Sequence, residues 1–77
     1  MSAELTRCRI SEALDLIDAS ANPLRVHCSA NYVSGYINAL RDEGIISRDG
    51  AQYYREDILE RRKRRLTEFG VELDAEG

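Results

Sequence analysis

The most constraining feature of this sequence is an Asp-Gly dipeptide that lies between two segments with helical patterns. Residues 48–57 read RDGAQYYRED. Asp49-Gly50 is the kind of pair most typical of a two-residue β-hairpin turn, because glycine tolerates the positive φ that this turn requires. We therefore expect a β-hairpin over residues 45–54. The alternative is a plain connector that buries two tyrosines.

Apolar residues before this turn recur at the spacing of two amphipathic helices. The first helix is expected to end near Pro23, because the residue before a proline avoids the α region. Residues 24–29 are expected to form a short strand or an extended turn. The second helix covers residues 30–43, with Ser29 as its N-cap and Gly44 in the left-handed position past its end. The apolar stripes are Ile10, Ala13, Leu14 and Ile17 in the first helix and Val33, Ile37 and Leu40 in the second.

A third helix is expected after the hairpin, from about Glu56 to Phe69, and Gly70 is expected to stop it. Its apolar stripe consists of Ile58, Leu59, Leu66 and Phe69. The domain organisation that follows is an N-terminal lead-in over 1–9, one folded domain over 10–70 and an acidic flexible tail over 71–77.

Length and composition indicate one small domain with an aliphatic core. The 77 residues are 43% hydrophobic and include no Trp and one Phe. No targeting pattern and no run of about 18 apolar residues occurs, so a cytoplasmic protein without a membrane partner is expected. Cys8, Cys28 and one histidine are too few for a zinc site, and no cofactor or metal is expected. Phosphate loops and nucleophile–base arrangements are missing as well, so no enzymatic activity is expected.

Charge is distributed unevenly along the chain. The formal net charge is −3, whereas a dedicated nucleic-acid-binding protein usually carries a basic excess. Residues 55–65 nevertheless hold six basic and three acidic side chains, including an unbroken basic run over 61–65. A local basic stripe is therefore expected inside a mildly acidic chain.

Two segments carry a resemblance to a known family. The segment VSGYINALRDEGIISRDG (33–50) resembles the recognition helix and wing entry of the winged helix-turn-helix superfamily. The segment YYREDILERRKRRL (53–66) is similar to the wing exit and following helix of the MerR and excisionase branch. The resemblance implies a single, mostly α domain with a small β-hairpin. It also implies binding of duplex DNA, with the helix at 30–43 in the major groove and a wing at 45–54 on the backbone.

The polar side chains around this expected fold form a candidate DNA-binding surface. Asparagine can pair with the adenine edge and arginine with guanine, while other arginines contact phosphates. The candidate residues are Asn31, Ser34, Asn38 and Arg41 on the second helix, Arg48 and Gln52 in the hairpin, and Arg61, Arg64 and Arg65 on the third helix. The expected function is that of a transcriptional regulator or an excisionase-like accessory factor. The alternative is that these side chains only form ordinary solvent-exposed faces of the helices. In that case Arg61, Arg64 and Arg65 would pair with Glu60 and Glu68.

A second function fits the acidic composition. A protein inhibitor on the same fold, such as an anti-CRISPR-like, phage-encoded antagonist of a host nucleic-acid-binding complex, would use carboxylates to bind a basic partner. The candidate partner-binding residues are Asp42, Glu43, Asp49, Glu72, Asp74 and Glu76. A homodimer is compatible with either function.

Overall fold

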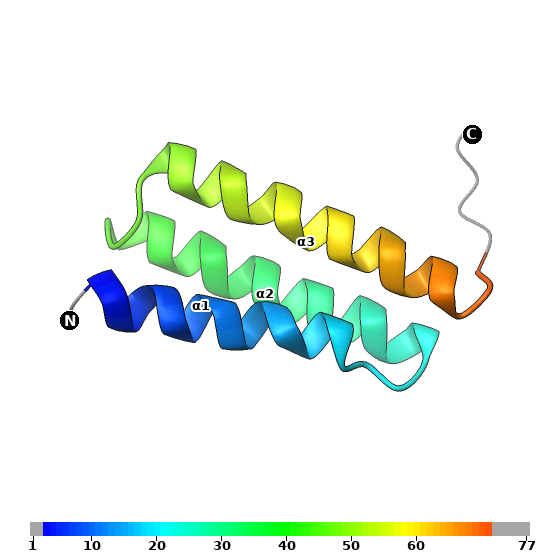
Figure 1. Cartoon of the computed structure of the whole chain (residues 1–77). Helices are drawn as coiled ribbons and strands as arrows, with labels where there is room; N and C mark the ends of the chain where they lie inside the picture. The colour runs from blue at the N-terminus through cyan, green and yellow to red at the C-terminus, as the bar shows by residue number, and fades with distance from the viewer. Residues whose placement is uncertain (1–2, 72–77) are drawn as a thin grey trace.

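The computed structural model describes residues 3–71, and this part of the chain folds as three helices. They are α1 (Ala3–Asp18), α2 (Pro23–Asp42) and α3 (Arg48–Glu68). Figure 1 shows them side by side, with α2 running opposite to α1 and α3. The bundle is elongated, with principal extents of 39 × 25 × 15 Å. Short connections between successive helices favour this up-down-up arrangement, because each helix returns directly along its predecessor.

A single apolar core runs between the three helices. Both stripes predicted before the turn are confirmed, since all of their members are buried. In the third helix Ile58 and Leu66 are buried and Phe69 packs against the core, whereas Leu59 is exposed, contrary to its predicted place in the stripe. The core residues are Ile10, Ala13, Leu14, Ile17, Val26, Ala30, Val33, Ile37, Leu40, Ala51, Ile58 and Leu66.

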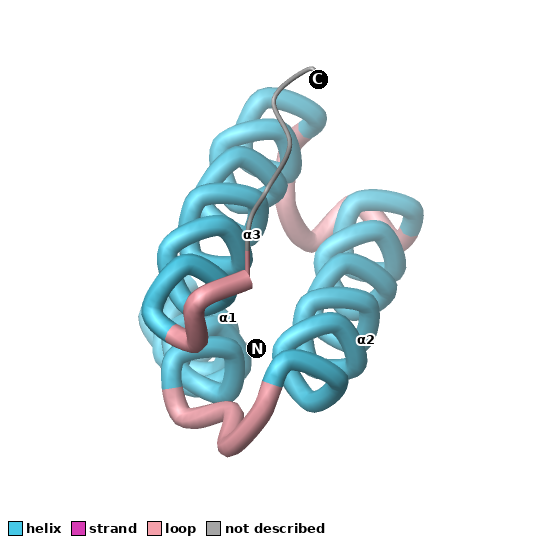
Figure 2. Tube along the Cα trace, turned by 90° about the vertical axis from the view of Figure 1, so that its right-hand side faces the viewer, coloured by secondary structure: helices cyan, strands magenta, loops and turns pink. Residues whose placement is uncertain are grey.

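The predicted β-hairpin at 45–54 is wrong, and with it the winged helix-turn-helix fold. No strand occurs within residues 3–71, and Figure 2 shows only helices and loops there. Ser47 is instead the N-cap of α3, where its Oγ accepts the Gly50 N–H at 3.0 Å. Ala51 is buried and Tyr54 packs against the core. These two residues extend the apolar stripe of Ile58 toward the N-terminus at helical spacing. The local capping and the apolar period together outweigh the turn preference of Asp-Gly.

The start of α2 is also earlier than predicted. Asn22 caps this helix, because its Oδ1 accepts the Arg25 N–H at 2.9 Å, and Pro23 occupies the first helical position. The Asn-Pro pair therefore begins a helix, and the strand or turn predicted at 24–29 is wrong. Ser29 is not an N-cap but an interior residue of α2, and its hydroxyl accepts a hydrogen bond from the Ser20 hydroxyl at 3.1 Å.

Two glycines end helices as predicted. Gly44 and Gly70 have φ of 75° and 80°, and each follows the last turn of its helix. After α2, the Gly44 N–H donates to the Arg41 carbonyl at 3.0 Å and the Ile45 N–H donates to the Leu40 carbonyl at 2.9 Å. These two bonds form the Schellman pattern, which satisfies carbonyls that the helix end leaves open.

The two ends of the predicted domain organisation have different outcomes. Residues 3–9 belong to α1, so the expected lead-in is helical from residue 3. Val71, the first residue of the expected acidic tail, packs against the core. The rest of that tail, 72–77, lies outside the described residues.

Candidate functional site

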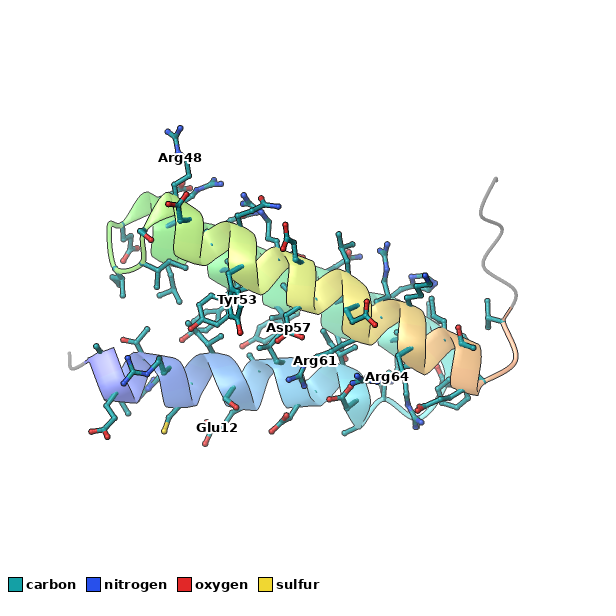
Figure 3. All side chains as sticks on the ribbon, turned by 45° about the horizontal axis from the view of Figure 1, so that its top comes forward. Glu12, Arg48, Tyr53, Asp57, Arg61 and Arg64 are labelled. Atoms are coloured by element: carbon teal, nitrogen blue, oxygen red, sulfur yellow. The ribbon has the colours of Figure 1, made fainter. Side chains whose placement is uncertain are left out.

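Helix α3 carries arginines on two flanks, and the flank toward α1 is neutralised within the molecule. Figure 3 shows Arg61 and Arg64 directed toward α1, whereas Arg48 projects away from the bundle at the start of α3. Arg61 donates to Asp57 at 3.0 Å within α3 and to Asp18 at 2.6 Å across to α1. Its Nη1 also lies 3.3 Å from Asp15 Oδ1. One guanidinium thus contacts three carboxylates, and two of them link α3 to α1.

The environment of Arg61 favours its charged form. Its side chain is only 21% exposed, and this burial by itself lowers the pKa of the guanidinium. The hydrogen bond and charge of Asp57, followed by the charge of Asp18, outweigh the burial, so the pKa of Arg61 lies above its ordinary value. The guanidinium therefore stays ionised at physiological pH.

The two other arginines on this flank are occupied as well. Arg64 donates to Asp18 at 2.8 Å. Arg65 donates to the Ser20 carbonyl at 2.9 Å and to Glu68 at 2.9 Å, and its guanidinium lies 4.4 Å from the centre of the Phe69 ring. The three arginines predicted to contact phosphate therefore hold the ends of α1 and α3 together, and the pairing of Arg65 with Glu68 is one that the helical spacing indicated.

The flank of α3 toward α2 has a different arrangement, centred on Arg55. This half-buried guanidinium donates to Asn38 Oδ1 at 3.0 Å and to Gln52 Oε1 at 3.1 Å. Both acceptors are neutral amides, and Arg55 has no ion pair with another residue of the 3–71 segment. Gln52 in turn donates to Glu56 at 3.1 Å. The amides fix the plane of the guanidinium but leave its charge uncompensated.

Further basic side chains lie above and below Arg55 on the same flank. Arg48, Arg55 and Arg62 are spaced by seven residues, so they lie on one side of α3. Toward the start of α3, a hollow of about 530 Å³ is lined by Arg41, Asp42, Ile46, Arg48 and Arg55. Toward its end, a hollow of about 390 Å³ is lined by His27, Leu59, Arg62, Lys63 and Leu66. We call the five cations of these hollows, Arg41, Arg48, Arg55, Arg62 and Lys63, the basic face.

Most of the basic face lacks a carboxylate partner. Arg41 pairs with its neighbour Asp42 at 3.2 Å, an exposed contact that contributes little. Arg48, Arg62 and Lys63 make no ion pair with any residue between 3 and 71. Arg55, Arg62 and Lys63 were absent from the predicted site, although the seven-residue spacing of the three arginines could have revealed this flank.

The side chains predicted to contact bases from α2 are only partly available. Asn31 is exposed and Ser34 is half-buried, whereas Asn38 is half-buried and engaged by Arg55. Arg48 and Gln52, predicted in a wing, lie in the first two turns of α3. The structure therefore brings Asn38, Arg41, Arg48 and Gln52 together around Arg55, but on helices and beside one another.

Three acidic residues of the alternative site lie within the described chain, at the end of α2 and the start of α3. Asp42 pairs with Arg41, and Glu43 is the C-cap residue of α2. Asp49 lies in the first turn of α3, where its negative charge interacts favourably with the helix dipole. Glu72, Asp74 and Glu76 lie outside the described residues.

The described residues contain no metal-binding cluster, no disulfide and no membrane-spanning helix. Between residues 3 and 71 no cluster of His, Cys, Asp and Glu could hold a metal ion. Cys8 and Cys28 are both exposed thiols without a disulfide. The described helices include none that combines the length and the apolarity needed to cross a membrane. Comparison with protein-family models, curated proteins and solved structures finds no match in any of the three.

Proposed function

We propose that this protein binds the phosphate backbone of nucleic acid, with duplex DNA as the preferred form, along the basic face of α2 and α3. One observation carries the proposal. The chain has fourteen acidic side chains against eleven basic ones, and it pairs Arg61, Arg64 and Arg65 with carboxylates. Within the described residues it nevertheless forms no ion pair with Arg48, Arg55 or Arg62 on the neighbouring flank of the same helix, although Asp42 lines the same hollow as Arg48 and Arg55. A shortage of acids therefore does not explain the uncompensated charge.

The arrangement of Arg55 supports an anionic ligand. The Arg55 residue is half-buried and has no ion pair within the 3–71 segment, so no counter-charge there offsets any desolvation of its guanidinium on folding. Asn38 and Gln52 hold it in place and leave its remaining N–H groups available. Guanidinium groups match phosphate oxygens in a two-pronged geometry, so a pre-oriented Arg55 suits a phosphate.

The length of the basic face suits several phosphates at once. From Arg48 to Arg62 the helix rises roughly 21 Å, at about 1.5 Å per residue. DNA carries one phosphate per about 3.4 Å of axis along each strand. Contacts of this kind hold a protein on the duplex but do not distinguish sequences. We therefore expect weak sequence preference. Asn31 and Ser34 are the polar side chains that we expect to contribute most to any contact with bases.

The test is a salt titration of binding to a labelled random duplex of about 20 base pairs. Five phosphate contacts predict a slope of about −4.5 in log K against log salt, so affinity should fall several hundred-fold between about 50 and about 200 mM salt. Replacing Arg48→Gln and Arg62→Gln together should weaken binding at least tenfold and reduce the slope by about 2.

A matched control separates the basic face from net charge. The double variant Arg7→Gln and Arg25→Gln removes the same charge from exposed positions elsewhere, and its affinity should stay within about twofold of the unmodified chain. Absence of measurable binding to the random duplex at about 50 mM salt would refute the proposal, and so would equal losses in the two double variants. If duplex RNA bound more tightly than DNA and the variants had the same effects, the basic face would still be the phosphate-binding surface, but RNA would be the preferred nucleic acid.

A further inference from the structure

A second surface, on α1, has a pattern that is complementary to itself. Leu5, Arg9, Glu12 and Leu16 follow one another at intervals of four, three and four residues, so they form one stripe along the helix. All four are exposed, and the two leucines are 44% and 48% exposed. In Figure 3 Glu12 lies on the side of α1 away from α3. We call these four residues the α1 stripe.

The order of residue types in the α1 stripe is apolar, basic, acidic, apolar. When two such stripes lie antiparallel and cross between Arg9 and Glu12, each Leu5 faces a Leu16 and each Arg9 faces a Glu12. Arg9 and Glu12 have no ion pair with other residues of the 3–71 segment, so both charges are available to a second copy. A parallel arrangement would oppose arginine to arginine and glutamate to glutamate, which is unfavourable.

Helix α2 adds an apolar border to the α1 stripe. A hollow of about 340 Å³ between the helices is lined by Arg9, Glu12, Ala13, Leu16, Tyr32 and Tyr36. Tyr32 is 62% exposed beside Leu16. In the antiparallel arrangement Leu5 of the second copy faces Leu16 and therefore approaches this tyrosine, and tyrosine is a residue type enriched in protein interfaces.

We infer that the protein forms a two-fold symmetric dimer in which the α1 stripes of two copies pack antiparallel. A two-fold contact uses the same patch on both copies, so it requires the self-complementarity that the α1 stripe has. The stripe rises only about 17 Å, at about 1.5 Å per residue. So small an interface supports a weak dimer, with a dissociation constant on the order of 10 μM to 1 mM.

The dimer does not depend on the proposed nucleic-acid binding. The α1 stripe lies along the α1–α2 side of the bundle, and the basic face lies between α2 and α3. Both basic faces therefore stay exposed in the dimer, which makes it able to hold two phosphate backbones. Failure of nucleic-acid binding would leave the dimer standing, because the two are measured separately.

Sedimentation velocity between about 10 μM and about 1 mM tests the inference. Arg9→Glu alone sets Glu against Glu12 of the second copy, and Glu12→Arg alone sets Arg against Arg9. Each should weaken the dimer at least tenfold. The combined variant R9E/E12R recreates both pairs with reversed polarity and should return to within about threefold of the original dissociation constant.

Two further measurements fix the geometry. A 1:1 mixture of R9E and E12R should form a heterodimer that is tighter than the homodimer of either variant, because one α1 stripe is then wholly acidic and the other wholly basic at its centre. Arg7→Glu changes the charge of α1 equally on another side and should leave association unchanged. A chain that stays monomeric at about 1 mM, a combined variant that fails to recover, or an R7E effect as large as that of R9E would overturn the inference.

Discussion

The two flanks of α3 present arginine in opposite circumstances. Toward α1, Arg61 contacts three carboxylates and Arg64 shares one of them. Toward α2, Arg55 contacts two neutral amides, and Arg48 and Arg62 contact no carboxylate within the described chain. Arginine therefore holds α1 and α3 together on one flank, whereas on the other flank it presents a positive charge without a counter-ion from the described chain.

The flank toward α1 therefore contributes more to the free energy of folding than the flank toward α2. Carboxylates around a partly buried guanidinium offset the penalty of its burial, whereas amides offset only part of it. Sites that serve a ligand are often less stable than the chain could make them. The contrast predicts that removal of an arginine lowers stability on the flank toward α1 and leaves it unchanged or raises it on the flank toward α2.

The largest effect is expected for Arg61→Gln. The change leaves Asp18 and Asp57 close together without their shared cation, so the free energy of unfolding should fall by about 1–2 kcal/mol. For a domain of this size that corresponds to a melting temperature lower by roughly 4–16 °C. Urea denaturation followed by circular dichroism measures it. Arg62→Gln is the matched control and should stay within about 0.5 kcal/mol; equal losses would show that the two flanks do not differ.

A smaller change of opposite sign is expected for Arg55→Met. Methionine keeps an unbranched stem in place of the aliphatic part of arginine and removes an uncompensated charge beside Arg41 and Arg48, so unfolding should require up to about 1 kcal/mol more free energy. The same variant should bind duplex DNA several-fold more weakly. Parallel urea denaturation and DNA titration measure both effects, and a loss of stability as large as that of Arg61→Gln would contradict this account of Arg55.

The smallest change is expected for Gly35→Ala, which separates stability from binding. Gly35 lies in the middle of α2, and a methyl group added there meets no atom within 4 Å. Alanine should therefore raise the free energy of unfolding by about 0.5–1 kcal/mol, the ordinary difference between these residues in a helix. DNA affinity should be unchanged. If this variant lost affinity as Arg55→Met does, extra stability rather than lost charge would account for the loss.

Sequence patterns were sufficient for most of the apolar core and for two helix ends. The stripe of Ile10, Leu14 and Ile17 can be recognised without tertiary information, because a helix that packs on one side must repeat apolar residues at this spacing. Gly44 and Gly70 were equally recognisable, since a left-handed residue past a helix end is most often glycine. These features are local, so they could be predicted.

The errors arose where one short motif had two meanings. Asp49-Gly50 indicates a hairpin turn, but Ser47 three residues before Gly50 is an N-cap, and Ala51, Tyr54 and Ile58 extend a helical stripe. Asn22-Pro23 was likewise interpreted as a helix end, although Asn at the cap and Pro at the first position also begin helices. The longer apolar period decides between the meanings in both places.

The candidate site was the least predictable part. The bond between Arg55 and Asn38 joins residues 17 positions apart, and it depends on how α2 and α3 pack. The occupation of Arg61 by Asp15 and Asp18 likewise follows from the approach of α1 to α3. A count of charges along the chain cannot separate the two flanks, because all of these arginines belong to one helix.

The short connections at 19–22 and 43–47 have a consequence for how quickly the protein acquires its structure. Each helix packs against the one that precedes it in the chain, so much of the folded molecule forms from segments that are already close. Helical bundles with such local topology reach their folded state in microseconds to milliseconds. This chain therefore does not depend on the pairing of distant strands, and we expect its apolar residues to become buried soon after folding begins.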